Sequence, residues 1–217
     1  MDLILWMDGQ IIVCRKPAGI LAQGDGSTES METLLSRQCG GSVYPVHRLD
    51  RQVGGVMVYA RTSQAAASLS AQIQRGAFQK EYFAIAEGIV PPEGRWENLL
   101  FRDSRRAKAF VVSRMRQGVK EARLSFCRLQ TAQLGLAPVS LCRVRLETGR
   151  FHQIRVQFAS RGFPLAGDGK YGGRISCPLG LFACHLQFSH PHTGKPMEFF
   201  QEPPETSPWD SFFYSKK

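Results

Sequence analysis

The sequence lacks several features that would place it in particular classes of protein. No stretch of its 217 residues approaches about 18 consecutive apolar side chains, so we expect no membrane-spanning helix. The first residues carry an acid, Asp2, where a secretory signal carries a base, and their apolar run is short. We therefore expect no signal peptide and a cytoplasmic location.

Cys-x-x-Cys pairs are also missing from the sequence. Its six cysteines are separated, and most of them lie in apolar, strand-like runs. This distribution is typical of buried, reduced thiols in a cytosolic protein. Because the number of cysteines is even, a set of disulfides is the alternative.

Acidic residues are scarce relative to basic ones. The chain has 18 Asp and Glu against 28 Lys and Arg, which gives a net charge of +10 and a pI of about 9.6. A basic balance favours an acidic partner, with nucleic acid first among the candidates. The length suits one domain, or one domain with two lobes, that buries a sizeable core.

Metal and nucleotide motifs are absent as well. His185, His190 and His192 lie near one another in sequence but lack cysteine or carboxylate ligands at metal-site spacing, so we expect no metal. The glycine-rich stretch 164–173 contains no G-x-x-x-x-G-K-[S/T] and is therefore no phosphate loop of the nucleotidase kind.

The most informative stretch, residues 44–60, is polar at first and then becomes an apolar strand. Asp50 is its only carboxylate, and His47, Arg48 and Arg51 surround it. Neighbouring positive charge keeps a carboxylate ionised at neutral pH. An ionised aspartate before a buried strand could act as a nucleophile. The alternative is a surface ion pair between Asp50 and an arginine, since such pairs also perturb pKa values.

Hydrophobic periodicity, caps and breakers predict the secondary structure. Strands are expected over 3–6, 11–14, 80–88, 122–126, 142–146, 181–191 and 197–200. Helices are expected over 30–39, capped by Ser30, over 63–76, capped by Ser63, and from Thr148 or Gly149 to Gly162. Loops are expected over 16–21 and 24–27, and Trp209, Phe212 and Phe213 should dock the C-terminal tail.

His47-Arg48-Leu49-Asp50, followed by Gly55 and an apolar strand, resembles the HRLD-x-x-[T/S]-[S/G]-G signature of the RluA family of RNA pseudouridine synthases. Further segments resemble the family's motifs in the same order, over roughly residues 4–200. They are the K-P-x-G loop at 16–19, K-x-Y-x-A at 80–84, T-G-R-x-H-Q-I-R at 148–155 and G-D-x-x-Y-G at 167–172. The chain departs from the usual residues at Val53, Gly54, Phe151 and Gln157.

The resemblance implies an α+β fold, the pseudouridine synthase fold. This fold has a mixed, mostly antiparallel bent sheet with flanking helices and a central cleft. The expected organisation is a single catalytic domain over residues 1–217, without the small N-terminal RNA-binding domain that related synthases often carry. The resemblance implies a monomer that acts on RNA and does not associate with a membrane. It also implies that no cofactor or metal is needed.

The resemblance also assigns a catalytic set. Asp50 corresponds to the family's catalytic aspartate, Arg155 to the arginine that pairs with it, and Tyr82 to the tyrosine that lies against the target base. A guanidinium stays charged and can fix the orientation of a carboxylate. Aromatic faces stack on unpaired bases, although a strand tyrosine without the resemblance is more often a core residue.

Candidate RNA contacts are basic or imidazole side chains near these motifs. They are Lys16, His47, Arg48, Arg51, Arg105, Arg106, Arg150 and His152. The densest basic stretch, Arg102 to Lys120, could track phosphates or be a solvated face. Lys16 could equally be a solvated loop lysine, and His152 could be a general base instead of a structural or RNA-contacting residue.

The implied reaction is isomerisation of uridine to pseudouridine in ribosomal or transfer RNA. A catalytically inactive RNA-binding protein of the same fold is the alternative, motivated by the four departures from the family's motifs. A glycosidic-bond hydrolase is a third class. It usually pairs two carboxylates, and no second one lies near Asp50 in sequence.

Overall fold

A computed structural model describes residues 3–24 and 28–213, so most of the loop expected at 24–27 lies outside the described residues. The chain divides into two compact units. The first comprises Met1–Lys80 and Phe182–Pro203, and the second comprises Glu81–Leu181 and Pro204–Lys217. Each unit is described by itself.

The first unit is built on a mixed sheet. Its strands are β1 (Ile4–Met7), β2 (Ile11–Lys16), β3 (Tyr44–Pro45), β4 (Gly54–Ala60), β10 (Leu181–Ser189) and β11 (Pro196–Phe200). The order is β1-β2-β4-β10, with β3 also paired to β4 and β11 to β10. β4 and β10 run parallel, and the other pairs are antiparallel.

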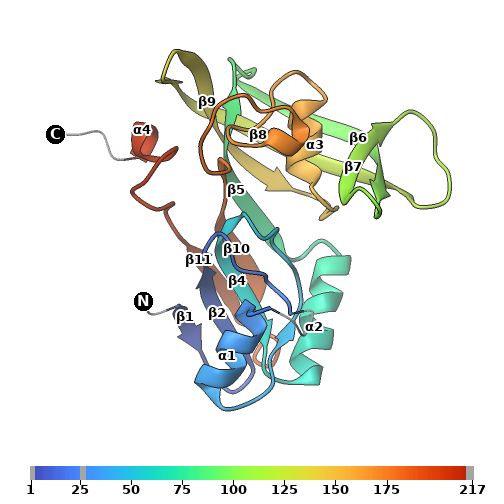
Figure 1. Ribbon diagram of the computed structural model, residues 1–217. Coiled ribbons are helices and arrows are strands. Elements are labelled where there is room, and N and C mark those ends of the chain that lie inside the picture. The colour runs from blue at the N-terminus through green and yellow to red at the C-terminus, as the bar shows by residue number, and fades with distance from the viewer. Residues whose placement is uncertain (1–2, 25–27, 214–217) are drawn as a thin grey trace. The chain divides into compact units, whose positions relative to one another are not determined.

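Two helices belong to this unit. Helix α1 (Met31–Cys39) begins at the predicted cap: the Ser30 hydroxyl accepts a hydrogen bond from the Thr33 amide in a capping box. Helix α2 (Ser63–Gln74) is capped by Thr62 instead of the expected Ser63. Its buried face packs on the sheet through Leu69, and Figure 1 shows α2 beside β4.

The second unit is built on an antiparallel sheet. Its strands are β5 (Gln79–Glu87), β6 (Glu93–Asp103), β7 (Lys108–Val112), β8 (Val119–Leu134) and β9 (Ala137–Leu146), in the order β5-β9-β8-β6-β7. The predicted alternation in β8 and β9 is confirmed. Leu124 and Val144 are fully buried, whereas Arg143 and Arg145 are exposed on the opposite face.

The helices of the second unit are short. They are α3 (Gln153–Ala159), the 3-10 turn η1 (Gly169–Tyr171) and α4 (Asp210–Phe213). Figure 1 shows α3 beside β6 and β7, with which it is in contact. Within the same unit Trp209 and Phe212 are buried and the Phe213 ring contacts Phe83, which confirms the docking expected of the tail.

The elements together confirm the α+β class with mostly antiparallel strands. All six cysteines are free thiols, as the sequence predicts. In the part of the chain that the structure describes, no helix has both the length and the apolarity to cross a bilayer.

Candidate active site

Asp50 lies in a tight turn directly before β4 in the first unit. Its backbone carbonyl accepts a hydrogen bond of 3.0 Å from the Val53 amide, and its side chain is half-buried. Val53 is 2% exposed and anchors the turn in the core. The turn thus holds Asp50 at the start of a fully buried strand.

Lys16 is the main support of this turn. It is fully buried, and its ammonium donates to the carbonyls of Pro17 (2.9 Å), Ile20 (2.6 Å) and Arg51 (3.2 Å). Burial lowers the pKa of Lys16 to about 8, while the nearby Asp50 carboxylate acts in the opposite direction. Lys16 is therefore not a solvated loop lysine: it ties the loop after β2 to the Asp50 turn, and its contact with RNA stays a prediction.

Two further hydrogen bonds join the loop after β2 to the Asp50 turn. The Gly19 amide donates to the Arg51 carbonyl at 2.7 Å, and Nε of Arg51 donates to the Gly19 carbonyl at 2.8 Å. Arg48 and Arg51 are otherwise exposed on either side of Asp50. Both remain candidates for contact with RNA phosphate.

His47 is a buried residue with a structural contact, and the RNA contact expected of it stays a prediction. It is 9% exposed, its Nε2 accepts from the Val58 amide at 3.2 Å, and its ring lies 5.4 Å from that of Phe78. Burial, with a smaller effect of the Lys80 charge, lowers the pKa of His47 to about 3. The imidazole is therefore neutral at physiological pH and faces the interior.

Gly55 shows why the motif ends in glycine. Its φ is 129°, and a Cβ there would overlap the backbone of Ala183, which is its partner across the parallel β4–β10 pair. Only glycine combines this φ with so close an approach of two backbones.

Arg155 and Asp168 form the buried core of the candidate site in the second unit. Nε of Arg155 donates to Oδ2 of Asp168 at 2.7 Å, and Nη2 donates to Oδ1 at 2.8 Å. Their side chains are 5% and 0% exposed. A buried ion pair with this two-bond geometry fixes the plane of the guanidinium.

The turn before α3 delays the helix relative to its predicted start. Oε1 of Gln153 lies 2.8 Å from the Thr148 hydroxyl and accepts from the Arg150 amide at 3.0 Å, so the chain stays in a turn. His152 then adopts the left-handed conformation, with φ of 53° and ψ of 25°, at the helix N-cap. Such conformations in non-glycine residues are costly and cluster at functional sites.

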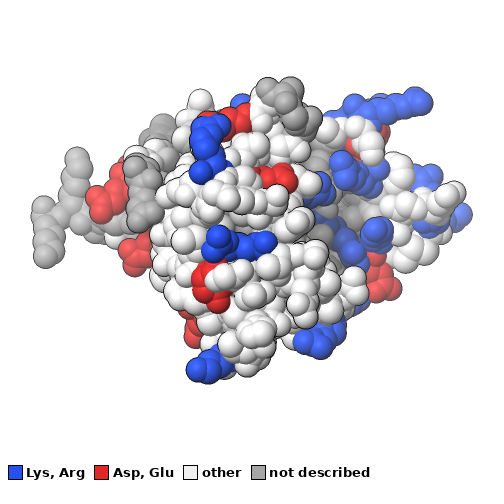
Figure 2. Space-filling model, turned by 90° about the horizontal axis from the view of Figure 1, so that it is seen from below, with Lys and Arg blue, Asp and Glu red and all other residues white. Residues whose placement is uncertain are grey.

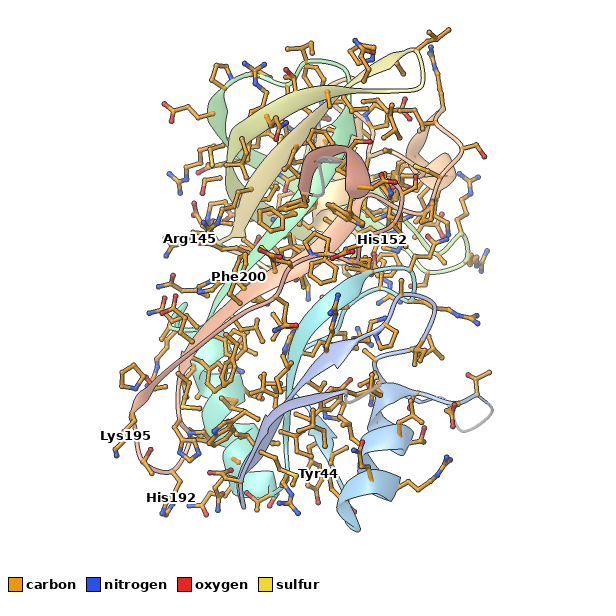
Figure 3. The ribbon with its side chains drawn as sticks, turned by 90° about the vertical axis from the view of Figure 1, so that its left-hand side faces the viewer. Tyr44, Arg145, His152, His192, Lys195 and Phe200 are labelled. Carbon is orange, nitrogen blue, oxygen red and sulfur yellow. The ribbon has the colours of Figure 1, made fainter. Side chains whose placement is uncertain are left out.

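His152 and Tyr171 lie against Arg155 in the same unit. Nδ1 of His152 is 2.9 Å from the Tyr171 hydroxyl, and its Nε2 is 3.2 Å from Nη1 of Arg155. The Phe151 ring stacks on His152 at 3.8 Å, and the guanidinium of Arg102 lies 4.4 Å from the Phe151 ring centre. His152, labelled in Figure 3, is thus packed within a polar cluster of the second unit.

The other predicted residues of the second unit divide into buried and exposed groups. Tyr82 is 7% exposed on β5, opposite Val144 of β9. Arg150 is half-buried, and its Nε donates to the Glu121 carbonyl at 2.8 Å. Arg105 and Arg106 are exposed in the turn that joins β6 to β7.

Exposed basic side chains are concentrated around the β6–β7 hairpin. Figure 2 shows Lys and Arg gathered at its right-hand side, the side on which Figure 1 draws β6 and β7. The exposed basic residues between positions 102 and 120 are Arg102, Arg105, Arg106, Arg114, Arg116 and Lys120. We refer to this set as the basic hairpin region.

The four departures from the family's motifs all have structural explanations. Val53 packs in the core, and a Cβ on Gly54 would lie 3.3 Å from the Lys16 carbonyl, a close contact. Phe151 stacks on His152. Gln157 is fully buried and donates to Oδ1 of Asn98 at 2.9 Å, so it is no surface contact.

Asp168 and Tyr171 were not among the residues predicted for the site. Both belong to the G-D-x-x-Y-G segment, which resembles a family motif but to which no role in the site was assigned. A signal for Asp168 existed: an arginine on an otherwise buried helix needs a carboxylate partner. Which carboxylate it finds depends on the tertiary structure.

The histidines near the C-terminus have partners unlike those of a metal site. Nε2 of His185 lies 2.8 Å from Glu198, and Nε2 of His190 lies 2.9 Å from Asp8. Nowhere in residues 3–24 and 28–213 do three potential ligands gather in a way that could hold a metal ion.

Comparison with known proteins agrees with these motifs. A family model described as RNA pseudouridylate synthase matches residues 10–160. The ribosomal large subunit pseudouridine synthase D of Neisseria meningitidis is 35% identical, over 90% of this chain and 56% of that protein. An uncharacterized RNA pseudouridine synthase of Aquifex aeolicus is 34% identical, over 94% of this chain and 70% of that protein. The chain therefore spans little more than half of the first relative's length.

A solved structure shares the fold. The human RNA pseudouridylate synthase domain containing 1 has a TM-score of 0.79 at 22% identity, over 95% of this chain and 85% of that chain. At this identity the likeness shows the fold alone. The family match over residues 10–160 and the 34% identity to the Aquifex aeolicus protein establish that the chain belongs to the RNA pseudouridylate synthase family.

Proposed function

We propose that this chain is an RNA pseudouridine synthase that isomerises uridine to pseudouridine. In this reaction the N1–C1′ bond breaks, the uracil turns and C5 bonds to C1′. A proton leaves C5 and N1 gains one, so atoms and electrons balance without an external electron acceptor. The base must leave its stack before it can react, and phosphate contacts in a basic protein help to hold such a state.

The observation that carries the proposal is the support given to Asp50. Its turn is fastened to the loop after β2 by the buried ammonium of Lys16, and the charge of that ammonium interacts with the Asp50 carboxylate. A nearby cation favours the ionised form, which either attack on the sugar or abstraction of its 2′ proton requires. These contacts support Asp50 as the proposed catalytic residue.

Arg155 is proposed as the ion-pair partner of Asp50. The two hydrogen bonds from Arg155 to Asp168 support this proposal, because they fix the plane of a guanidinium that stays charged and can orient a carboxylate. Tyr82 is proposed as the group that stacks on the uracil.

The proposed substrate class is ribosomal RNA, with transfer RNA as the alternative. Relatives named as ribosomal large subunit synthases favour the first. The basic hairpin region, with Arg48 and Arg51, is the proposed phosphate-binding surface. Free thiols at all six cysteines favour a cytoplasmic location.

Nucleoside analysis of treated RNA tests the proposal. After incubation with the chain and complete digestion, the RNA should contain new pseudouridine at the expense of uridine. Free uracil as the product would indicate a hydrolase instead. Unchanged nucleosides in RNA that the chain binds would favour an RNA-binding protein without activity.

A further inference from the structure

Arg155 has side-chain neighbours in addition to its ion-pair partner Asp168. Asp168 binds one edge of the guanidinium, His152 lies 3.2 Å from Nη1, and the Tyr171 ring centre is 5.2 Å from the guanidinium carbon. Three side chains from two segments thus contact the same cation. Its orientation depends on all three of them.

The hydrogen bonds identify the tautomer of His152. Arg155 can only donate, so Nε2 of His152 must accept. A neutral imidazole carries one N–H, which is then on Nδ1 and points to the Tyr171 hydroxyl 2.9 Å away. That hydroxyl oxygen also accepts from the Ala109 amide at 2.8 Å, which fixes its place.

The charges around His152 favour the neutral form that this arrangement needs. Burial, the largest effect, lowers the pKa of His152 to about 3, and the charges of Arg155, Lys170 and Arg102 also lower it. The carboxylate of Asp168 opposes them. A protonated imidazole would direct an N–H at the Arg155 guanidinium.

The same cluster is anchored to the β6–β7 hairpin. Ala109 lies in β7, and Nζ of Lys170, next to Tyr171, donates to the Ala107 carbonyl at 3.0 Å. From β6, Arg102 covers the Phe151 ring that stacks on His152. The hairpin that carries exposed arginines therefore also braces the cluster.

We propose that His152 and Tyr171 are positioning residues for Arg155, with His152 as the Nδ1–H tautomer held by the Tyr171 hydroxyl. This inference rests on the proposed function, in which Arg155 orients Asp50. His152 is then no general base, because its Nε2 is engaged by a cation and its Nδ1 proton by the hydroxyl. Substrate RNA does not need to touch either residue.

Nitrogen NMR of the histidine side chains tests the tautomer without any assay of activity. The His152 signals, assigned by their loss in His152→Gln, should show a protonated Nδ1 and a bare Nε2 between pH 8 and pH 5. In Tyr171→Phe this preference should weaken. An Nε2–H tautomer, or titration near the ordinary histidine pKa, would overturn the proposal.

Steady-state kinetics tests the positioning role. Both Tyr171→Phe and His152→Ala should lower kcat by roughly 10- to 100-fold while KM for RNA stays unchanged, because only the orientation of Arg155 is lost. His152→Gln should recover part of kcat, since an amide oxygen can accept from Nη1. An unchanged kcat in both Tyr171→Phe and His152→Ala would contradict the proposal. So would a kcat of His152→Gln that is no higher than that of His152→Ala.

Two exposed residues of the first unit provide matched controls, Tyr44→Phe and His192→Ala; both residues are labelled in Figure 3. Their kcat should equal that of the unaltered chain. Absence of any reaction with the unaltered chain would overturn the proposed function itself. In that case the NMR result alone decides whether the arrangement of His152 is correct.

Discussion

The guanidinium of Arg155 and the carboxylate of Asp168 meet inside the second unit in two parallel hydrogen bonds of 2.7 Å and 2.8 Å. Both side chains are almost completely removed from solvent. The charge of Arg155 is thus balanced, and its guanidinium oriented, by an acid of its own unit.

Asp168→Asn should strongly destabilise the protein. It removes the carboxylate that binds Nε and Nη2 of the buried Arg155, and breaking a buried ion pair typically costs about 3–5 kcal/mol. Urea unfolding measures the loss. The control is Asp103→Asn, because Asp103 forms a more exposed ion pair with Arg106 at 3.7 Å and should cost less than about 1 kcal/mol. If both variants lose the same free energy of unfolding, the buried ion pair stabilises the protein no more than the exposed one does.

His47 should make stability depend on pH. Its pKa is lowered from 6.5 to about 3 in the folded chain, so between these values the unfolded state binds a proton that the folded state does not. The free energy of unfolding therefore falls as the pH drops, by about 1.4 kcal/mol per pH unit well inside this window. Urea unfolding between about pH 6 and pH 4 measures this slope.

His47→Gln should remove this contribution to the slope. The amide oxygen of glutamine can still accept from the Val58 amide but does not titrate in this range. His192→Gln, at an exposed histidine, is the matched control and should keep the original slope. If the slope stays the same in His47→Gln, His47 is not the group responsible.

Gly55→Ala should disrupt the first unit at the edge of the candidate site. The added methyl would overlap the Ala183 backbone, and the φ of 129° is unsuited to alanine. We expect a loss of about 2–4 kcal/mol in the free energy of unfolding. Gly9→Ala, where a Cβ meets nothing within 4 Å, is the control and should change it far less.

The basic hairpin region should contribute to RNA binding through its charge. The double variant Arg105→Gln with Arg106→Gln should flatten the dependence of log K on log salt by about 1.4 to 1.8, if both side chains contact phosphate. Filter binding at several salt concentrations measures this slope. Arg37→Gln with Arg75→Gln removes the same charge from exposed positions on the first unit and should leave the slope unchanged.

Much of the fold could be predicted because local signals agreed with the tertiary structure. Helix α1 begins after its predicted cap Ser30, and the alternation of β8 and β9 matches their buried and exposed faces. The start of α3 was predicted too early. The side chain of Gln153 binds the preceding turn, which no propensity of Thr148 or Gly149 reveals.

The residues of the site were harder to assign from sequence. A basic side chain near a motif looks like a phosphate contact, yet Lys16 and His47 are buried and bond to backbone groups. Asp168 was missed because its partner lies 13 residues away on another element. The burial of a side chain and the identity of its partner depend on packing between distant segments. A short motif contains no information on either of them.

Asp50 is proposed to carry out the isomerisation of uridine, and tritium release from RNA is the first measurement that would test this. RNA labelled at C5 of uridine is incubated with the chain or with Asp50→Asn, using ribosomal and transfer RNA separately. We expect the unaltered chain to release tritium from ribosomal RNA and Asp50→Asn to release none, although the variant still binds the RNA. Full release by Asp50→Asn, or no release from either pool by the unaltered chain, would contradict it.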